Sequence, residues 1–205
     1  MCEFDLKAEG QSVPCLYFDR PGAENTEATL KRAALRAEEL KIKQVVVASA
    51  SGETALKAAS IFRGCRLVAV THSTGFYRPN YQEMSDEVRA RLEQLGVKVL
   101  TCQHALGGVN RAVRKKLGSY QLDEIIAYAL RTFGEGVKVA IEVSLMAADA
   151  GLIRTGEPCI AIGGTEKGAD TAILLKPVNA QNFFDLRIME ILAKPGFYQQ
   201  EDSSD

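Results

Sequence analysis

The chain has 205 residues, of which 46% are hydrophobic and 25% are charged, and its formal net charge is -1. This length and composition are typical of a soluble globular protein with one large or two small domains. The near-neutral charge gives no indication of nucleic acid or an anionic membrane as a partner, and no apolar run approaches the roughly 18 residues that span a bilayer.

The N-terminus, Met1 to Lys7, lacks the basic region followed by an apolar one that marks a secretory signal. Five scattered cysteines form no CxxC pair, so we expect neither disulfides nor a zinc site. Three of them, Cys65, Cys102 and Cys159, lie in or beside apolar strand patterns and are interpreted as small buried hydrophobes. We therefore expect a cytoplasmic protein.

The first predicted elements are a short strand and a helix. Ser12 to Phe18 is expected to be an edge strand, because Pro14 lies within it. Asn25 and Thr26 can cap the helix that follows. The spacing of its apolar residues predicts a core face of Leu30, Ala33, Ala34, Ala37 and Leu40.

Residues 44–55 combine a strand, a turn and the start of a helix. The buried strand 44–49 breaks into the polar turn Ser49 to Thr54, and Ala55, Ala58, Ala59 and Phe62 then follow at helical spacing. Free backbone N–H groups and the positive end of a helix dipole meet hydroxyl groups there. Such a corner favours an anion, usually phosphate, although a plain turn with Ser51 as its N-cap is the alternative.

The middle of the chain continues the alternation of strands and helices. A buried strand, Cys65 to Thr71, precedes a polar and aromatic loop; Asn80 with Glu83 resembles a capping box. The helix that follows has Met84, Val88, Leu92 and Leu95 on one face and ends at Gly96. Further along lie a strand at 97–101, an irregular basic stretch at 103–120 and a helix from Gln121 to Phe133, ended by Gly134.

Residues 137–151 carry two conflicting patterns. Val137 to Ser144 alternate as in a strand, whereas Leu145 to Ala150 form a helical stretch closed by Gly151. Lys138, Glu142 and Asp149 would share one polar stripe on a helix. Because a parallel strand needs a crossover connection, we predict one long buried helix.

The C-terminal part supplies two more strands. Pro158 to Ile162 is a buried strand that breaks into the loop Gly163 to Gly168, and Thr171 to Lys176 is another. Continuous apolar strands alternating with helices predict a mostly parallel sheet in one α/β domain, residues 1–198, with residues 199–205 as a disordered tail. Ligands of such folds bind beyond the carboxyl ends of the strands, where both glycine-bearing loops are expected.

These motifs resemble the C-terminal alpha/beta domain of pyruvate kinase over roughly residues 25–176. The marks are Ser51-Gly-x-Thr-Ala55, Leu67-Val-Ala-Val-Thr71, and Gly163-Gly164 before Gly168-Ala-Asp-Thr-Ala172. More closely, the chain resembles stand-alone archaeal and bacterial proteins with that fold. The motifs shared with that group are Pro21–Thr26, Val70–Phe76, His104–Leu106, Met146–Leu152, Ala161–Thr165, Gly168–Ala172, Phe183–Leu186 and Ala193–Pro195.

The resemblance implies a three-layer α/β/α fold around a mixed five-strand sheet of order 3-2-1-4-5, with the last strand antiparallel. The N-terminal edge strand would add to it. In pyruvate kinase the loop that matches Ser49 to Thr54 receives a phosphate of the sugar-bisphosphate effector. In the stand-alone group the implied ligand is flavin mononucleotide (FMN). The catalytic apparatus of pyruvate kinase belongs to its barrel domain, which this chain lacks, so pyruvate kinase activity is not expected.

The candidate site has three parts. In the turn at 49–54, backbone N–H groups would bind phosphate while Glu53 points outward. Side chains of the loop after Thr71 would bind a ribityl chain or phosphate and stack on a ring, with loop packing as the alternative. Lys167 would neutralise phosphate or remain solvated. The candidate residues are Ser49, Ser51, Gly52, Glu53, Thr54, Thr71, His72, Ser73, Phe76, Tyr77, Gly163, Gly164, Thr165 and Lys167.

Other polar residues receive structural interpretations. His72 is an acid–base candidate, but hydrogen bonding without catalysis is favoured, and His104 is expected to be structural. Glu142, Asp149, Asp170 and Asp185 match no metal-ligand spacing, so ion pairs or caps are expected and no metal. The first functional hypothesis is FMN binding, with flavin-dependent redox chemistry left open. The alternatives are a non-catalytic sensor of a sugar phosphate and, less favoured, phosphoryl transfer; homo-oligomerisation is also left open.

Overall fold

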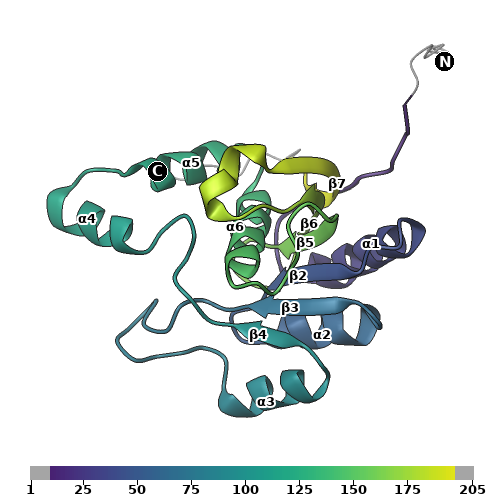
Figure 1. Cartoon of the computed structure of the whole chain (residues 1–205), viewed down its shortest axis with the longest axis horizontal. Coiled ribbons are helices and arrows are strands. Elements are labelled where there is room, and N and C mark those ends of the chain that lie inside the picture. Colours follow the sequence, from purple (N-terminus) through teal and green to yellow (C-terminus); the bar gives the residue numbers. More distant parts are fainter. Residues whose placement is uncertain (1–9, 197–205) are drawn as a thin grey trace.

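The computed structural model describes residues 10–196 (Figure 1). The tail predicted to be disordered, residues 199–205, lies outside the described residues. Seven strands form one sheet in the order β1-β7-β6-β5-β2-β3-β4, and β6 is antiparallel to both of its neighbours. The strands are β1 Leu16–Phe18, β2 Gln44–Ala48, β3 Arg66–Val70, β4 Lys98–Leu100, β5 Cys159–Gly163, β6 Thr171–Lys176 and β7 Arg187–Pro195.

The expected five-strand sheet is present within this larger one. Read from β4 to β6, the strands follow the implied order 3-2-1-4-5, and the last of them is antiparallel. Two strands extend the sheet beyond β6. The edge strand β1 is confirmed but is shorter than expected, because Pro14 lies outside it, while β7 has no counterpart among the predicted elements.

Helices cover both faces of the sheet, as predicted. Because side chains alternate along β2, Val45 and Val47 pack with α1, α2 and α3, whereas Val46 packs with α6 on the other face. The three-layer arrangement is therefore confirmed. The helices are α1 Thr26–Glu39, α2 Glu53–Ile61, α3 Asp86–Gln94, α4 Val109–Leu117, α5 Leu122–Arg131 and α6 Glu135–Asp149.

Helix α6 resolves the conflict over residues 137–151 in favour of a helix. All but one of its residues from Gly136 to Ala148 are buried, because it lies between the sheet and a second cover formed by α5 and the short helix Ala180–Asp185. A helix enclosed on both sides can be apolar around its circumference, which explains why its sequence lacks a clear helical period.

Several local expectations were wrong. Asn80 and Glu83 form no capping box: α3 begins at Asp86, and Ser85 is its N-cap, with Oγ accepting from the amide of Val88. Leu40 and Leu95 are exposed instead of lying in the core. The basic stretch after Gln103 contains a helix, α4, that buries none of its residues.

The cysteines within residues 10–196 are free thiols. Cys159 is buried, and this burial raises the pKa of its thiol to about 12, whereas Cys65 and Cys102 are half-buried. No helix in this part of the chain is long and apolar enough to cross a membrane.

Candidate functional site

The start of α2 lies where the strand order of the sheet reverses. The chain passes from β2 to β3 on one side, whereas β5 flanks β2 on the other, with Val47 opposite Ile162. The turn after β2 and the loop after β5 therefore leave neighbouring strands at the same carboxyl edge, as predicted. In open α/β sheets this position is the usual ligand crevice.

The first turn of α2 leaves backbone donors available. The N-cap position of α2 is Gly52, not Ser51, and no side chain caps the helix there; the buried Oγ of Ser49 accepts from the amide of Ala55 at 3.1 Å. The exposed Ser51 Oγ lies 3.5 Å from the amide nitrogen of Glu53, and the amide of Thr54 has no hydrogen-bond acceptor among the described residues. The side chain of Glu53 is exposed, as predicted.

Gly52 is required by packing as well as by the turn. Its φ of 95° lies in the left-handed region, and a Cβ there would meet Val88 Cγ1 on α3 at 2.3 Å. Replacing Gly52 would therefore disturb the fold, so loss of ligand binding in such a variant would not identify a phosphate site.

The glycines of the loop after β5 also serve close approach. A Cβ on Gly163 would meet the carbonyl oxygen of Gly136 on α6 at 2.3 Å, and one on Gly164 would meet that of Gly168 at 2.6 Å. A Cβ on Gly168 would meet Thr26 Oγ1 at 2.4 Å. These glycines bring α6, the loop and the start of α1 together, which is a structural role.

Asp170 joins this loop to the segment before α1. Its side chain is fully buried, and Oδ2 accepts from the amides of Gly22 and Thr165 while Oδ1 accepts from the Thr171 hydroxyl. Asp170 is therefore a buried cap, as expected. Lys167 is exposed at the tip of the loop, consistent with either of the roles considered for it.

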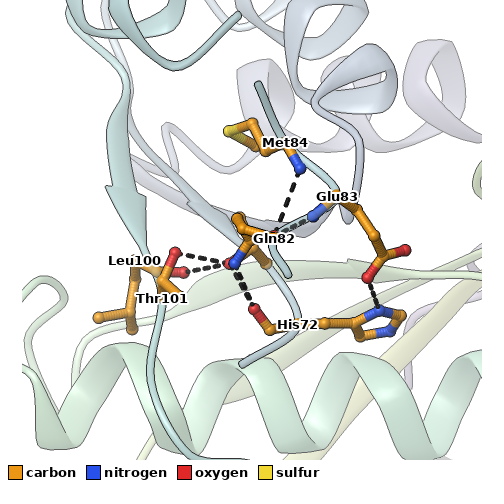
Figure 2. A network of polar contacts seen from close by, with 7 residues as sticks. His72, Gln82, Glu83, Met84, Leu100 and Thr101 are labelled. Atoms are coloured by element: carbon orange, nitrogen blue, oxygen red, sulfur yellow. Dashed lines mark hydrogen bonds and ion pairs between the residues drawn. The ribbon is translucent and has the colours of Figure 1, made fainter. Parts of the chain in front are cut away.

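The loop between β3 and α3, residues 71–85, is held by Gln82 (Figure 2). Its Nε2 donates to the carbonyl oxygen of His72 at 3.0 Å, and its Oε1 accepts from the amides of Glu83 and Met84. The hydroxyl of Thr71 is hydrogen-bonded to that of Thr101 at 2.7 Å. Thr71 is therefore engaged within the protein and is less available to a ligand than the sequence indicated.

The aromatic side chains of this loop stack on histidines. The ring of Phe76 lies 4.3 Å from that of His72 and 5.0 Å from that of His104, nearly parallel to both. Tyr77 meets the rings of His72 and Phe76 edge-on, and the Arg111 guanidinium lies 4.9 Å from the Phe76 ring centre. The rings predicted to stack on a ligand thus already pack against their own loop and its neighbours, which is the alternative considered above.

Each histidine of the stack faces a glutamate. His72 Nδ1 lies 2.6 Å from Glu83 Oε2 (Figure 2), whereas His104 Nδ1 lies 3.7 Å from Glu142 Oε2. The latter distance is within ion-pair range but exceeds hydrogen-bond length, so both buried ring nitrogens of His104 lack a hydrogen-bond partner among the described residues.

Glu142 belongs to a buried ion pair on α6. Its Oε2 accepts from Lys138 Nζ at 2.5 Å, and its Oε1 accepts from the amide of Leu106 at 3.0 Å. Burial raises the pKa of Glu142, but His104 and Lys138 outweigh this effect and lower the pKa to about 2. The expected structural ion pair is confirmed, with a lysine one helical turn away as its partner.

Sequence reasoning missed the position of residues 19–25. A hollow of about 420 Å³ is lined by Tyr17, Phe18, Asp19, Arg20, Glu24 and Asn25. Because β1 runs parallel to β7, and β7 parallel to β5, this hollow lies at the same carboxyl edge as the two loops. The motif Pro21–Thr26 could have pointed to this segment, but it was interpreted only as a turn and a helix cap.

The remaining carboxylates of residues 10–196 suggest no metal site. Asp149 accepts from the Asn179 side chain and the Ala180 amide, so it caps a turn. No group of three or more histidine, cysteine, aspartate or glutamate side chains gathers within metal-binding reach in this part of the chain. A larger hollow, about 580 Å³, lies between the ends of α2 and α3 at the opposite edge of the sheet, away from every candidate residue.

Comparison with known proteins adds a family match. The pyruvate kinase alpha/beta domain family matches residues 27–175. Two crystal structures of pyruvate kinase from Cryptosporidium parvum are similar at 17% identity over 78% of this chain, with TM-scores of 0.40 and 0.38. The chain covers 24% and 23% of those two proteins, so it spans about a quarter of their length.

Proposed function

The chain belongs to the family of the pyruvate kinase alpha/beta domain, and we propose that it binds a phosphate-bearing small molecule, FMN, at the carboxyl edge of its sheet. The observation that carries this proposal is the start of α2. There the Thr54 amide and the exposed Ser51 hydroxyl are available at a helix N-terminus, beside the point where strand order reverses. Oriented amides and the helix dipole favour a phosphate at such a position.

The dimensions of the sheet suit an elongated ligand. Neighbouring strands lie about 4.8 Å apart, so the loops after β2 and β4 are separated by roughly 10 Å. That distance is comparable to a ribityl chain between a phosphate and a ring. A flavin ring would then lie above His72, Phe76 and His104, the three rings that follow β3 and β4.

Flavin binding would require the stacked rings to rearrange. Phe76 is already covered by His72, His104 and Arg111, so a flavin stacks on it only if one of these side chains moves away. Bound FMN would supply redox chemistry. The role proposed for the chain's own residues is to bind and orient the ligand.

The proposal is tested by titrating the purified protein with FMN while recording its visible absorbance and its melting temperature. FMN at 100 times its Kd should stabilise the fold by about 2.7 kcal/mol. Riboflavin, which lacks the phosphate, should bind at least about tenfold more weakly, because a charge-assisted hydrogen bond contributes roughly 1.5–3 kcal/mol. Equal affinity for both flavins would contradict the phosphate site.

A substitution at Ser51 tests whether the phosphate of FMN binds at the start of α2. Ser51→Asp adds a negative charge beside the proposed phosphate, while an acidic residue at a helix N-terminus is compatible with folding. It should weaken FMN binding, whereas Ser119→Asp, in the exposed turn between α4 and α5, should not. Unchanged FMN affinity in Ser51→Asp would place the ligand elsewhere.

A non-catalytic sensor of a sugar phosphate is the second candidate. It is favoured by the closed stack at Phe76, because a ligand without an aromatic ring needs no stacking surface. It predicts that a hexose bisphosphate raises the melting temperature more than FMN does, with the same loss in Ser51→Asp. Indifference to both compounds would remove both candidates.

A further inference from the structure

Helices α4 and α5 form an arm, residues 109–133, that extends from the body of the protein. Figure 1 shows α4 at the end of the molecule remote from α1. Helix α4 buries none of its residues and is attached to α5 by contacts of Asn110 with Asp123 and of Arg114 with Glu124. Among the described residues, α5 is the arm helix that packs on the body, against α6, while α4 reaches the body through Arg111 at the Phe76 ring.

The arm exposes an unusual amount of apolar surface. Of the 17 exposed large hydrophobic side chains within residues 10–196, seven lie in this arm, each between 50% and 71% exposed. They are Val109, Leu117, Tyr120, Leu122, Ile125, Tyr128 and Phe133. Soluble monomers rarely show such clusters, and large exposed apolar patches commonly mark interaction surfaces.

The exposed side chains of α5 are ordered along the helix. Leu122, Ile125 and Ala129 of α5, and Phe133 in the turn just beyond its end, follow one another at intervals of three, four and four residues, and all are exposed. This spacing places them on one stripe, as in a helix that packs against another helix. The opposite side of α5 carries its buried residues, so the stripe faces away from α6.

We propose that this arm is the interface at which a second copy of the chain associates, with the α5 stripes of the two copies packed together about a two-fold axis. An aromatic side chain can bury about 150–250 Å², so each half-exposed aromatic residue offers roughly 100 Å². With similar areas for the aliphatic residues, the seven side chains of the arm offer on the order of 700 Å² per copy, of which the three large residues of the stripe supply less than half. An interface near the roughly 800 Å² per partner of a standard complex therefore involves α4 and the α4–α5 connection as well as the α5 stripe.

The charges of the arm favour a second copy over a membrane. Binding to an anionic lipid surface needs several available cations. Three of the arm's five cations are engaged: Arg111 with Phe76, Arg114 with Glu124 and Arg131 with Glu135. The surface that remains is mainly apolar and can match itself across a two-fold axis, the commonest symmetry of soluble oligomers.

The inference does not depend on FMN binding, although the interface adjoins the candidate site. Arg111 of α4 lies over the Phe76 ring, which stacks on His72 and His104. A second copy packed on the arm would therefore lie beside the contact between Arg111 and Phe76.

The test is sedimentation equilibrium of the full chain between low and high micromolar concentrations. The wild type should sediment as a dimer. Ile125→Lys and Leu122→Lys, tested separately, should each raise the dimer Kd at least about tenfold, because a central apolar contact is replaced by a charge. The control, Leu35→Lys, changes a leucine of α1 that is equally exposed and should leave the Kd unchanged.

Further measurements check that the variants fold and whether a membrane is the partner instead. Lysine is a good helix former and both positions are exposed, so the circular dichroism of the variants should match that of the wild type. If a variant fails to fold, the change of the wild-type mass with concentration still shows whether the chain forms a dimer. A wild type that stays monomeric throughout this range overturns the proposal, as does an equal Kd in all three variants. Co-sedimentation of a monomeric wild type with phosphatidylserine vesicles would instead assign the arm to a membrane surface.

Discussion

The Nζ atom of Lys138 lies 2.5 Å from Oε2 of Glu142, and both side chains are only 4% exposed. The two residues are one turn apart on α6, and His104 lies beside the carboxylate. Buried charges are tolerated only when they are paired, so each residue of this pair depends on the other.

Removing the lysine should therefore be costly. In Lys138→Met the carboxylate of Glu142 stays buried without its partner, and the free energy of unfolding should fall by about 3–5 kcal/mol. Urea denaturation at pH 7 measures this change. The double variant Lys138→Met/Glu142→Gln removes both charges but keeps an acceptor for the Leu106 amide, so it should recover most of the loss. A single variant as stable as the wild type would show that the pair is dispensable.

The same carboxylate predicts acid sensitivity. The pKa of Glu142 lies below its ordinary value of 4.5, at about 2. Its stabilisation is therefore fully present above pH 4.5 and is lost as the pH falls towards 2. The full effect is about 3 kcal/mol, of which about 2 kcal/mol should be lost by pH 3. Urea denaturation at several pH values checks this, and Glu142→Gln should show a flatter pH dependence; an identical slope in both proteins would contradict the assignment.

Gly52→Ala should destabilise the fold by about 1–3 kcal/mol, because the new Cβ combines an unfavourable positive φ with a clash against Val88. Thermal or urea unfolding gives the value. In the Val88→Ala background the substitution should cost less, since the clash is relieved and only the backbone strain remains. An equal cost in both backgrounds would mean that Val88 plays no part.

Asp170→Asn should loosen the loop after β5. Asn presents one acceptor oxygen, so either the amides of Gly22 and Thr165 or the hydroxyl of Thr171 loses its acceptor. We expect a loss of about 1–3 kcal/mol and faster tryptic cleavage after the exposed Lys167. The control is Asp149→Asn, whose cap lies at the other end of α6, and it should leave cleavage at Lys167 unchanged. Equal cleavage rates in wild type and Asp170→Asn would disprove the tether.

Gln82→Ala should release the loop at 71–85 without unfolding the sheet. The amides of Glu83 and Met84 lose their side-chain acceptor, and the carbonyl of His72 loses a donor (Figure 2). Hydrogen exchange of residues 72–84 should become faster, while exchange in β2 and β5 stays as slow as in the wild type. Gln94→Ala, at the exposed end of α3, is the matched control. Unchanged exchange in the loop would show that other contacts hold it.

The sequence predicted the core of the fold well. Apolar runs such as Val45–Val47 and Ile160–Ile162 indicate buried strands, because both faces of a central parallel strand are covered. Regular spacing predicted α1 and α2. It failed for β7, which was not assigned, and for α4, whose exposed residues carry no core-facing period.

The sequence predicted which loops share one edge of the sheet, but not the contacts within them. The sequence indicated that the turns after β2 and β5 lie at one edge, since strand ends and turn residues are local signals. It did not show that Gly52 rather than Ser51 is the N-cap of α2, or that Phe76 stacks on His72 and His104. These choices depend on segments that are distant in the sequence.

The sequence by itself determined the type of most elements, the mostly parallel sheet and the edge at which a ligand is expected, because hydrophobic period and turn chemistry act over a few residues; the antiparallel strand of the sheet was implied only by the family resemblance. Only the tertiary structure decided that Lys138 and Glu142 are buried as a pair. It also decided that the glycines of the loop after β5 allow close packing, and that the apolar stripe of the arm is exposed. Each of these features depends on which segments, distant in the sequence, pack together in the folded chain. Burial, and not residue type alone, determines how much a charged or apolar group changes the free energy of folding.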